Sequence, residues 1–166
     1  MKKVIEFFKN IYHKLDRYPK IKSQLRYLIH FPGGAGELAW SSAVGAFIGV
    51  AVPEGLQTVT SIGAAYLFRM NFLVITFFTL ITNPFTIVPL YYTSFRIGEW
   101  IMGMSITAIQ IENLFNNPGI TTALELGTSG AIIFLTGSLV HGLFWGGVWY
   151  ILMFAFYPKL KKVIKN

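Results

Sequence analysis

The hydrophobic pattern of the first 30 residues is that of a helix with one apolar face. Val4, Phe7, Phe8, Ile11 and Leu15 follow helical spacing with lysines between them, which predicts an amphipathic helix running up to Pro19. A second helical piece is expected over 21–29, so residues 1–30 form a basic helical segment. Its polar face suits the cytoplasmic surface of a membrane. Packing on a partner, or on the protein's own cytoplasmic face, is an equal alternative.

Beyond this segment the chain consists of long charge-free runs. They cover residues 38–53, 55–68, 70–95 and 126–158. A bilayer core of about 30 Å requires roughly 20 apolar helical residues. The last two runs exceed this length, which predicts an integral membrane protein. A soluble helical domain is the weaker alternative, because few charges would remain to solvate its surface.

Two of the apolar segments are interrupted near their middle. A single helix over 38–68 would be about 46 Å long, more than the bilayer core. Its halves, 38–52 and 56–68, are each too short to span, which favours a hairpin that enters and leaves on one side. The second broken segment covers 72–95. The helix breaks are Pro53 and Gly55 in the first segment, and Pro84 and Pro89 in the second.

The chain therefore divides into a series of helical parts. We expect an all-α integral membrane fold of broken or re-entrant helical hairpins plus transmembrane helices, with the amphipathic basic helix before them. The parts after residue 30 are a membrane domain at 38–103, an interfacial helix and loop at 104–127, a transmembrane segment at 128–157 and a basic cytoplasmic tail at 158–166. The transmembrane segment is too long for one upright helix.

Charge gives the expected orientation. The formal net charge is +7, and residues 1–30 hold eight of the 14 basic residues, while four lysines lie at 159–165. Basic flanks mark the cytoplasmic side, so both termini are expected there. This favours an even number of crossings, which results either from a re-entrant 38–68 with two crossing segments or from hairpins in all three segments. Anionic lipid headgroups explain the charge better than nucleic acid, since no recognition motif accompanies it.

Several kinds of chemistry find no support in the sequence. Cysteine is absent, which excludes disulfides and thiolate zinc sites. We find no phosphate-binding loop, metal-ligand cluster or paired carboxylates, so we expect no cofactor, no metal and no conventional enzyme. The first 30 residues lack the continuous apolar region of a cleavable signal, so the first apolar span would direct insertion.

The two broken segments carry a recognisable residue pattern. The elements are Gly45, Phe47, Ile48, Gly49, Pro53, Gly55, Gln57, Thr58, Asn71, Asn83, Pro84, Thr86, Pro89, Leu90, Tyr91, Tyr92 and Gly98. Over roughly 38–103 this pattern resembles the membrane-domain family catalogued as domain of unknown function 2062. Glu54 departs from it, because an apolar or proline residue is expected there. The resemblance implies a bacterial membrane domain, attached in some relatives to glycosyltransferase-like domains, and hints at envelope or lipid-linked sugar metabolism.

Polar side chains at the breaks are the main candidate site. A proline frees the carbonyl four residues earlier, which needs a partner in lipid. Asn83, Thr82 and Thr86 can satisfy the second break locally. Alternatively, Asn83 and Thr86 converge with Gln57 and Thr58 on a polar pocket, where two half-helix N-termini would favour a phosphate or carboxylate.

Three charged residues near the breaks and one histidine are further candidates. Glu54 is the only acid between 38 and 98, and it is either buried and functional or placed at a hairpin tip in water. Arg69 and Arg96 are interpreted as interfacial anchors, with pairing to Glu54 or phosphate binding as the alternative. His141 has no second ligand in its span, which favours a hydrogen-bonded packing role over a metal or a proton relay.

Two pairs of glycines predict close helix packing. Gly45 and Gly49, and likewise Gly142 and Gly146, are spaced as GxxxG pairs, which let helices approach within the chain or between copies. A homo-oligomer is expected, because one such chain makes a thin wall around a polar path.

Two functions remain open at this point. The first is a small inner-membrane transporter, or a protein handling lipids or lipid-linked anions, with a polar site at the helix breaks. The alternative is a non-transporting scaffold or partner subunit for an envelope glycan or lipid enzyme. Membrane lipids are expected partners in both.

Overall fold

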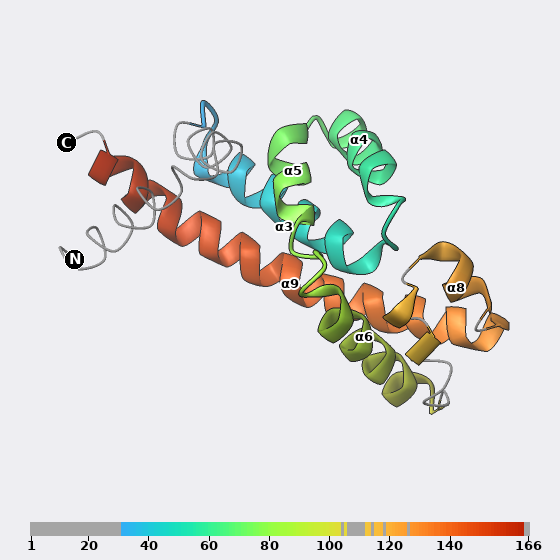
Figure 1. Ribbon diagram of the computed structural model, residues 1–166. Coiled ribbons are helices and arrows are strands. Elements are labelled where there is room, and N and C mark those ends of the chain that lie inside the picture. Colours follow the sequence, from blue (N-terminus) through green and yellow to red (C-terminus); the bar gives the residue numbers. More distant parts are fainter. Residues whose placement is uncertain are drawn as a thin grey trace.

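The computed structural model is a set of helices arranged along one long helix (Figure 1). It describes residues 31–103, 105, 112–113, 115–117, 119–125 and 127–164. Their helices are α3 (Ala35–Ala51), α4 (Gln57–Phe68), α5 (Phe72–Thr79), α6 (Ile87–Met102), α8 (Ile120–Glu125) and α9 (Gly127–Ile164). The all-α expectation is confirmed for this part of the chain. The expected amphipathic segment at 1–30 lies outside the described residues.

Helix α9 forms the spine of the fold. It has 38 residues, which corresponds to about 57 Å at 1.5 Å per residue. The sequence predicts that residues 128–157 are too long for one upright helix. In the structure they nevertheless lie within one unbroken helix. Within it, Gly130–Pro158 is the one helix in the described part that is long and apolar enough to cross a membrane. A tilted helix accommodates such length.

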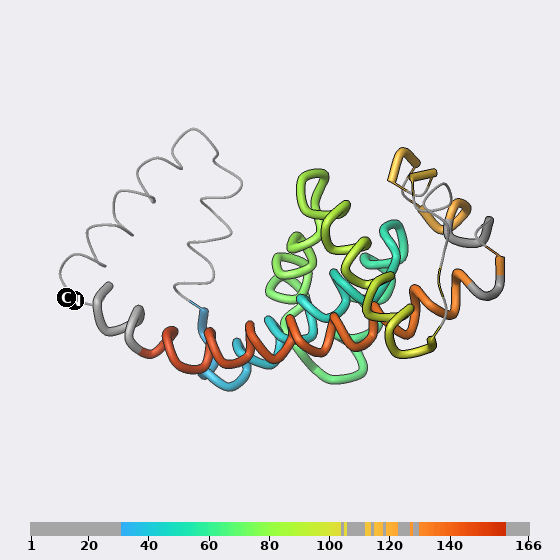
Figure 2. The backbone as a smooth tube through the Cα atoms, turned by 90° about the horizontal axis from the view of Figure 1, so that it is seen from below, coloured from blue at the N-terminus to red at the C-terminus, as the bar shows by residue number. Residues whose placement is uncertain are grey.

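Helices α3 and α6 pack along different parts of α9, as the view from below shows (Figure 2). A Cβ placed on Gly146 would lie 3.0 Å from the Ala43 carbonyl of α3, and one on Gly142 would lie 3.0 Å from Phe47. The second glycine pair therefore packs on α3. Gly45 and Gly49 of α3 pack on α5 in the same way. Both predicted glycine pairs thus serve contacts within the chain.

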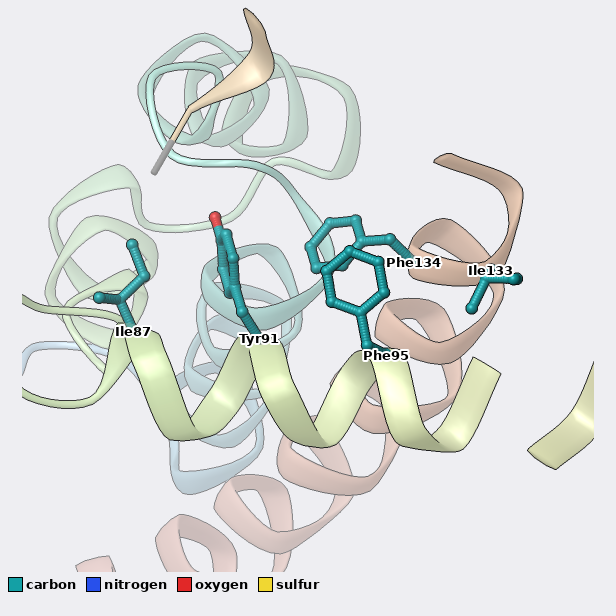
Figure 3. Close-up of a cluster of buried hydrophobic side chains, with 5 residues drawn as sticks. All are labelled: Ile87, Tyr91, Phe95, Ile133 and Phe134. Carbon is teal, nitrogen blue, oxygen red and sulfur yellow. The ribbon is translucent and has the colours of Figure 1, made fainter. Parts of the chain in front are cut away.

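A closer approach joins α6 to α9 through one glycine on each helix. A Cβ on Gly98 would meet the Ile133 carbonyl, and a Cβ on Gly137 would meet the Ser94 carbonyl and lie 2.6 Å from the Gly98 nitrogen. Around this crossing one face of α6 supplies Ile87, Tyr91 and Phe95, and α9 supplies Ile133 and Phe134 (Figure 3). The spacing of four residues on α6 puts its three side chains on one stripe.

The second apolar run divides into α5 and α6, as its proline break predicts. Asn71 starts α5, because its side-chain oxygen accepts from the Val74 amide at 3.1 Å. Residues 80–86 separate the two helices. The structure corrects the expectation for Pro89, which lies in the first turn of α6. Proline is tolerated there because first-turn amides have no intrahelical acceptor.

Candidate functional site

The C-terminal end of α3 is the point on which polar groups converge. In a continuing helix the Gly49 carbonyl would accept from the amide of residue 53, but Pro53 has no N–H. The last turn is completed one residue earlier, where the Val52 amide donates to the Ile48 carbonyl at 3.0 Å. The Gly49 carbonyl therefore needs a donor from elsewhere.

Two side chains supply that donor, one from each helix break. Gln57 Nε2, at the start of α4, donates to the Gly49 carbonyl at 3.0 Å and to the Val52 carbonyl at 3.2 Å. Thr82 Oγ1, between α5 and α6, donates a hydrogen bond to the same Gly49 carbonyl. The two breaks predicted from the sequence thus meet at one acceptor.

Helices α6 and α9 also reach this end of α3. Ser138 Oγ of α9 shares its one proton between the Leu135 carbonyl of its own helix at 3.1 Å and the Ala51 carbonyl at 3.3 Å. The Glu54 amide donates to the Tyr91 hydroxyl at 3.0 Å. Figure 3 shows the Tyr91 hydroxyl pointing away from α6 towards this connection. We call Gly49, Gln57, Thr82, Tyr91 and Ser138 the break junction.

Asn83 and Thr86 bond within their own loop. The Asn83 side-chain oxygen accepts from the amides of Phe85 at 3.0 Å and Thr86 at 3.3 Å, and the Asn83 amide donates to Thr86 Oγ1 at 3.0 Å. These bonds close a turn over residues 83–86 directly before α6, whose N-cap residue Thr86 makes no side-chain capping bond to the helix. Thr86 Oγ1 also donates to the Ile81 carbonyl at 2.5 Å.

The pocket expected at the two half-helix N-termini is therefore arranged differently in the structure. The donors before α6 are taken by Asn83 and Thr86, which leaves them no role as free anion ligands. Gln57 instead shares the Gly49 carbonyl with Thr82, and Thr58 is exposed. Of the four residues expected to line that pocket, only Gln57 belongs to the break junction, and Thr82, expected to satisfy its own break, bonds across to α3.

The three charged candidates form no ion pair with one another in the described part of the chain. Glu54 is exposed beside Gly55, and Arg69 is exposed at the C-terminus of α4. Arg96 Nη1 forms an ion pair with Glu99 Oε2 at 2.6 Å, with side chains 61% and 6% exposed. Sequence reasoning missed Glu99, whose spacing of three residues from Arg96 on a helix was the available signal.

His141 is buried and hydrogen-bonded on both ring nitrogens. Trp145 Nε1 donates to His141 Nε2 at 3.0 Å, and His141 Nδ1 lies 3.0 Å from Ser94 Oγ. Because an indole N–H can only donate, Nε2 accepts and the proton of the neutral ring is on Nδ1. His141 thereby joins α9 to α6, in agreement with the hydrogen-bonded packing role.

Removing the Trp145 donor should change the His141 tautomer. We expect Trp145→Phe to raise the Nε2-protonated fraction roughly two- to tenfold, since a hydrogen bond contributes about 0.5–1.5 kcal/mol. Nitrogen-15 NMR of histidine-labelled protein measures this fraction. The matched control is Trp149→Phe, because Trp149 Nε1 is on the same helix and has no partner. Identical His141 spectra in both variants would contradict the assignment.

The break junction lies well inside the apolar span of α9. The span begins at Gly130, and Ser138 follows it by eight residues, or about 12 Å of helix. The described residues contain no group of three or more His, Cys, Asp or Glu suited to a metal ion. The junction consists of neutral hydrogen-bonding groups, which can hold helices together or exchange partners with a polar ligand.

Comparison with known proteins gives one family match. A family model described as an uncharacterized protein conserved in bacteria, DUF2062, matches residues 20–163. No curated protein and no solved structure gives a significant match. The match covers all of the described helices apart from the last residue of α9.

Proposed function

The chain belongs to the bacterial DUF2062 family, and we propose that it is a small inner-membrane protein that moves or handles a lipid or a lipid-linked anion. The observation that carries this proposal is the break junction. Two helix breaks, far apart in sequence, share one carbonyl at the depth of the apolar span. Broken helices meeting at membrane depth are typical of transport sites.

The exposed surface favours a substrate with a hydrocarbon part. Large apolar side chains are exposed on both α4 and α9. On α4 they are Val59, Ile62, Tyr66, Leu67 and Phe68, and on α9 they include Leu143, Phe144, Ile151 and Phe154. Such surfaces suit contact with lipid chains. A lipid could therefore reach the junction sideways from the bilayer, with its polar head meeting the hydrogen-bonding groups.

The orientation in this proposal follows from charge. Lysines at 159–165 and the basic residues of 1–30 place both termini in the cytoplasm. Helix α9 then makes one crossing of the inner membrane and α5–α6 makes the other, while α3–α4 forms a re-entrant hairpin, which gives the even number of crossings that cytoplasmic termini require. A homo-oligomer would complete the wall around the polar path.

Lipid movement in proteoliposomes tests the proposal. We expect the chain to accelerate the exchange of fluorescent phospholipid or polyprenyl phosphate between leaflets. Thr82→Val should slow it about tenfold, because loss of one buried hydrogen bond of about 1.4 kcal/mol changes a rate tenfold. The matched control is Thr58→Val, at an exposed position of the other break. Exchange no faster than in protein-free vesicles, or equal rates for both variants, would refute the proposal.

A scaffold or partner subunit for an envelope enzyme is the second candidate. It is favoured by the exposed apolar faces of α4 and α9, which could equally hold another membrane protein. Deleting residues 1–29 separates the two functions. A scaffold should lose its partner in co-purification, whereas a transport core should keep its lipid exchange.

A further inference from the structure

Helix α4 is held to the rest of the fold by few contacts. Of its 12 residues only Ser61 and Ala64 are buried. Ala64 belongs to a small cluster with Ile48 of α3 and Ile75 of α5. By comparison, 11 of the 17 residues of α3 are buried. Low burial of this kind marks elements that open at little free-energy cost.

A bilayer makes this attachment weaker still. In water, the exposed apolar side chains of α4 would favour packing against the protein. In lipid they are already in an apolar solvent, so association depends on close packing and hydrogen bonds. The three residues Val59, Tyr66 and Leu67 are each more than two-thirds exposed, and they therefore contribute little to holding α4 in place.

Both ends of α4 have backbone conformations suited to hinges. Gly55, two residues before the helix, has φ of 98°, a region that glycine occupies without steric cost. Arg69, directly after the helix, has φ of 52° in the left-handed region, and it is the only non-glycine residue with positive φ in the described part of the chain. Changes at these two positions would turn α4 as a rigid body.

One side chain bonds the start of α4 to the end of α3. Gln57, the first residue of α4, bonds to the carbonyls of Gly49 and Val52 at 3.0 and 3.2 Å. On the inner face of the same helix, the Ser61 hydroxyl is 1% exposed and has no hydrogen-bond partner. An unpartnered buried hydroxyl costs free energy. Ser41 of α3 carries the same cost, but Ser61 lies on the weakly held helix, where the cost favours a second arrangement that satisfies the hydroxyl.

We propose that α4 is a gate over the break junction, hinged at Gly55 and Arg69 and latched by Gln57. Opening withdraws the Gln57 amide from the Gly49 and Val52 carbonyls, while Thr82 stays on Gly49, and it presents that amide and the Ser61 hydroxyl to the polar head of a lipid. The gate deepens the proposed lipid-handling function and rests on it for its ligand. Its motion is measured without any substrate.

Cysteine labelling tests the gate directly, because the chain has no cysteine of its own. Ser61→Cys places a thiol on the inner face of α4, and Ser41→Cys places an equally buried thiol in α3, where Ser41 is 0% exposed. In lipid bilayers we expect N-ethylmaleimide to modify Ser61→Cys at least tenfold faster than Ser41→Cys. Adding Gln57→Leu should speed Ser61→Cys labelling about tenfold, the effect of about 1.4 kcal/mol.

The controls separate the gate from other effects. Thr58→Val, next to the latch but exposed, should leave both rates unchanged. If Gln57→Leu loosens the whole fold, the labelling rate of Ser41→Cys rises as well. The gate is then tested by the labelling rates of Ser61→Cys and Ser41→Cys in the protein that keeps Gln57. Equal slow labelling of both thiols would overturn the gate. Fast Ser61→Cys labelling in a protein that moves no lipid would refute the proposed function and leave the gate standing.

Discussion

Gly137→Ala will lower the melting temperature of the protein by pushing α6 away from α9. The new Cβ would meet the Ser94 carbonyl and lie 2.6 Å from the Gly98 nitrogen. Both are backbone atoms, which cannot rotate aside as a side chain would. Overpacking of this kind costs about 1–3 kcal/mol and occasionally more. At roughly 2–4 °C per kcal/mol for a chain of this size, we expect a decrease of about 2–12 °C.

The same helix supplies the control for this experiment. A Cβ on Gly147 would have no atom within 4 Å, so Gly147→Ala replaces glycine by the better helix former without a clash. Its melting temperature should equal or exceed that of the unmodified protein. The melting temperature of each variant is measured by heating it in detergent and monitoring the folded fraction by size-exclusion chromatography. If Gly137→Ala melts like Gly147→Ala, the close crossing of α6 and α9 is wrong.

Combining Thr82→Val with Gln57→Leu should have the second largest effect. Either change alone leaves the Gly49 carbonyl with one side-chain donor, and the pair leaves it with none. An unsatisfied buried carbonyl costs about 1–3 kcal/mol. We therefore expect the double variant to lose more stability than the sum of the single variants, by an interaction of about 1 kcal/mol or more.

Restoring a backbone donor provides the matching rescue. Pro53→Ala supplies the amide that proline lacks, four residues after Gly49. In the double variant this amide should recover part of the lost stability, whereas in the unmodified protein it should bring little. Melting temperatures of the cycle of variants measure the coupling. Additive single effects, together with no rescue by Pro53→Ala, would mean that the Gly49 carbonyl is not the shared acceptor.

The sequence allowed the helix breaks to be located but not their partners. Pro53 and the Asn83–Pro84 pair interrupt apolar runs, and a proline effect is local enough to be read directly. One of the two donors to the Gly49 carbonyl is Thr82, 33 residues away, and that pairing depends on how α3 packs on α5. Asn83 is an equally suitable donor to that carbonyl by residue type. Its side-chain oxygen, however, accepts from the Phe85 and Thr86 amides within its own turn.

Close helix packing could be predicted where two glycines lie four residues apart on the same helix. Gly45–Gly49 and Gly142–Gly146 show the GxxxG spacing and do lie at close contacts. Gly98 and Gly137 approach each other more closely. They lie on different helices, so no spacing along the sequence marks them as a pair. The pairing of Glu99 with Arg96 could be predicted from their spacing of three residues, but the burial of Glu99 could not. Its burial comes from the packing of α6, and no property of residue 99 alone shows it.

The length of α9 has a consequence for the inner-membrane placement that we propose. The apolar stretch Gly130–Pro158 has 29 residues, or about 43 Å of helix against a hydrocarbon core of about 30 Å. A helix about 13 Å too long must tilt strongly or thicken the bilayer around it, at a cost that rises with each ångström of mismatch. Longer lipid chains reduce that cost, so the acyl-chain length of the membrane sets the tilt of α9 and, through Ser138, the geometry of the break junction.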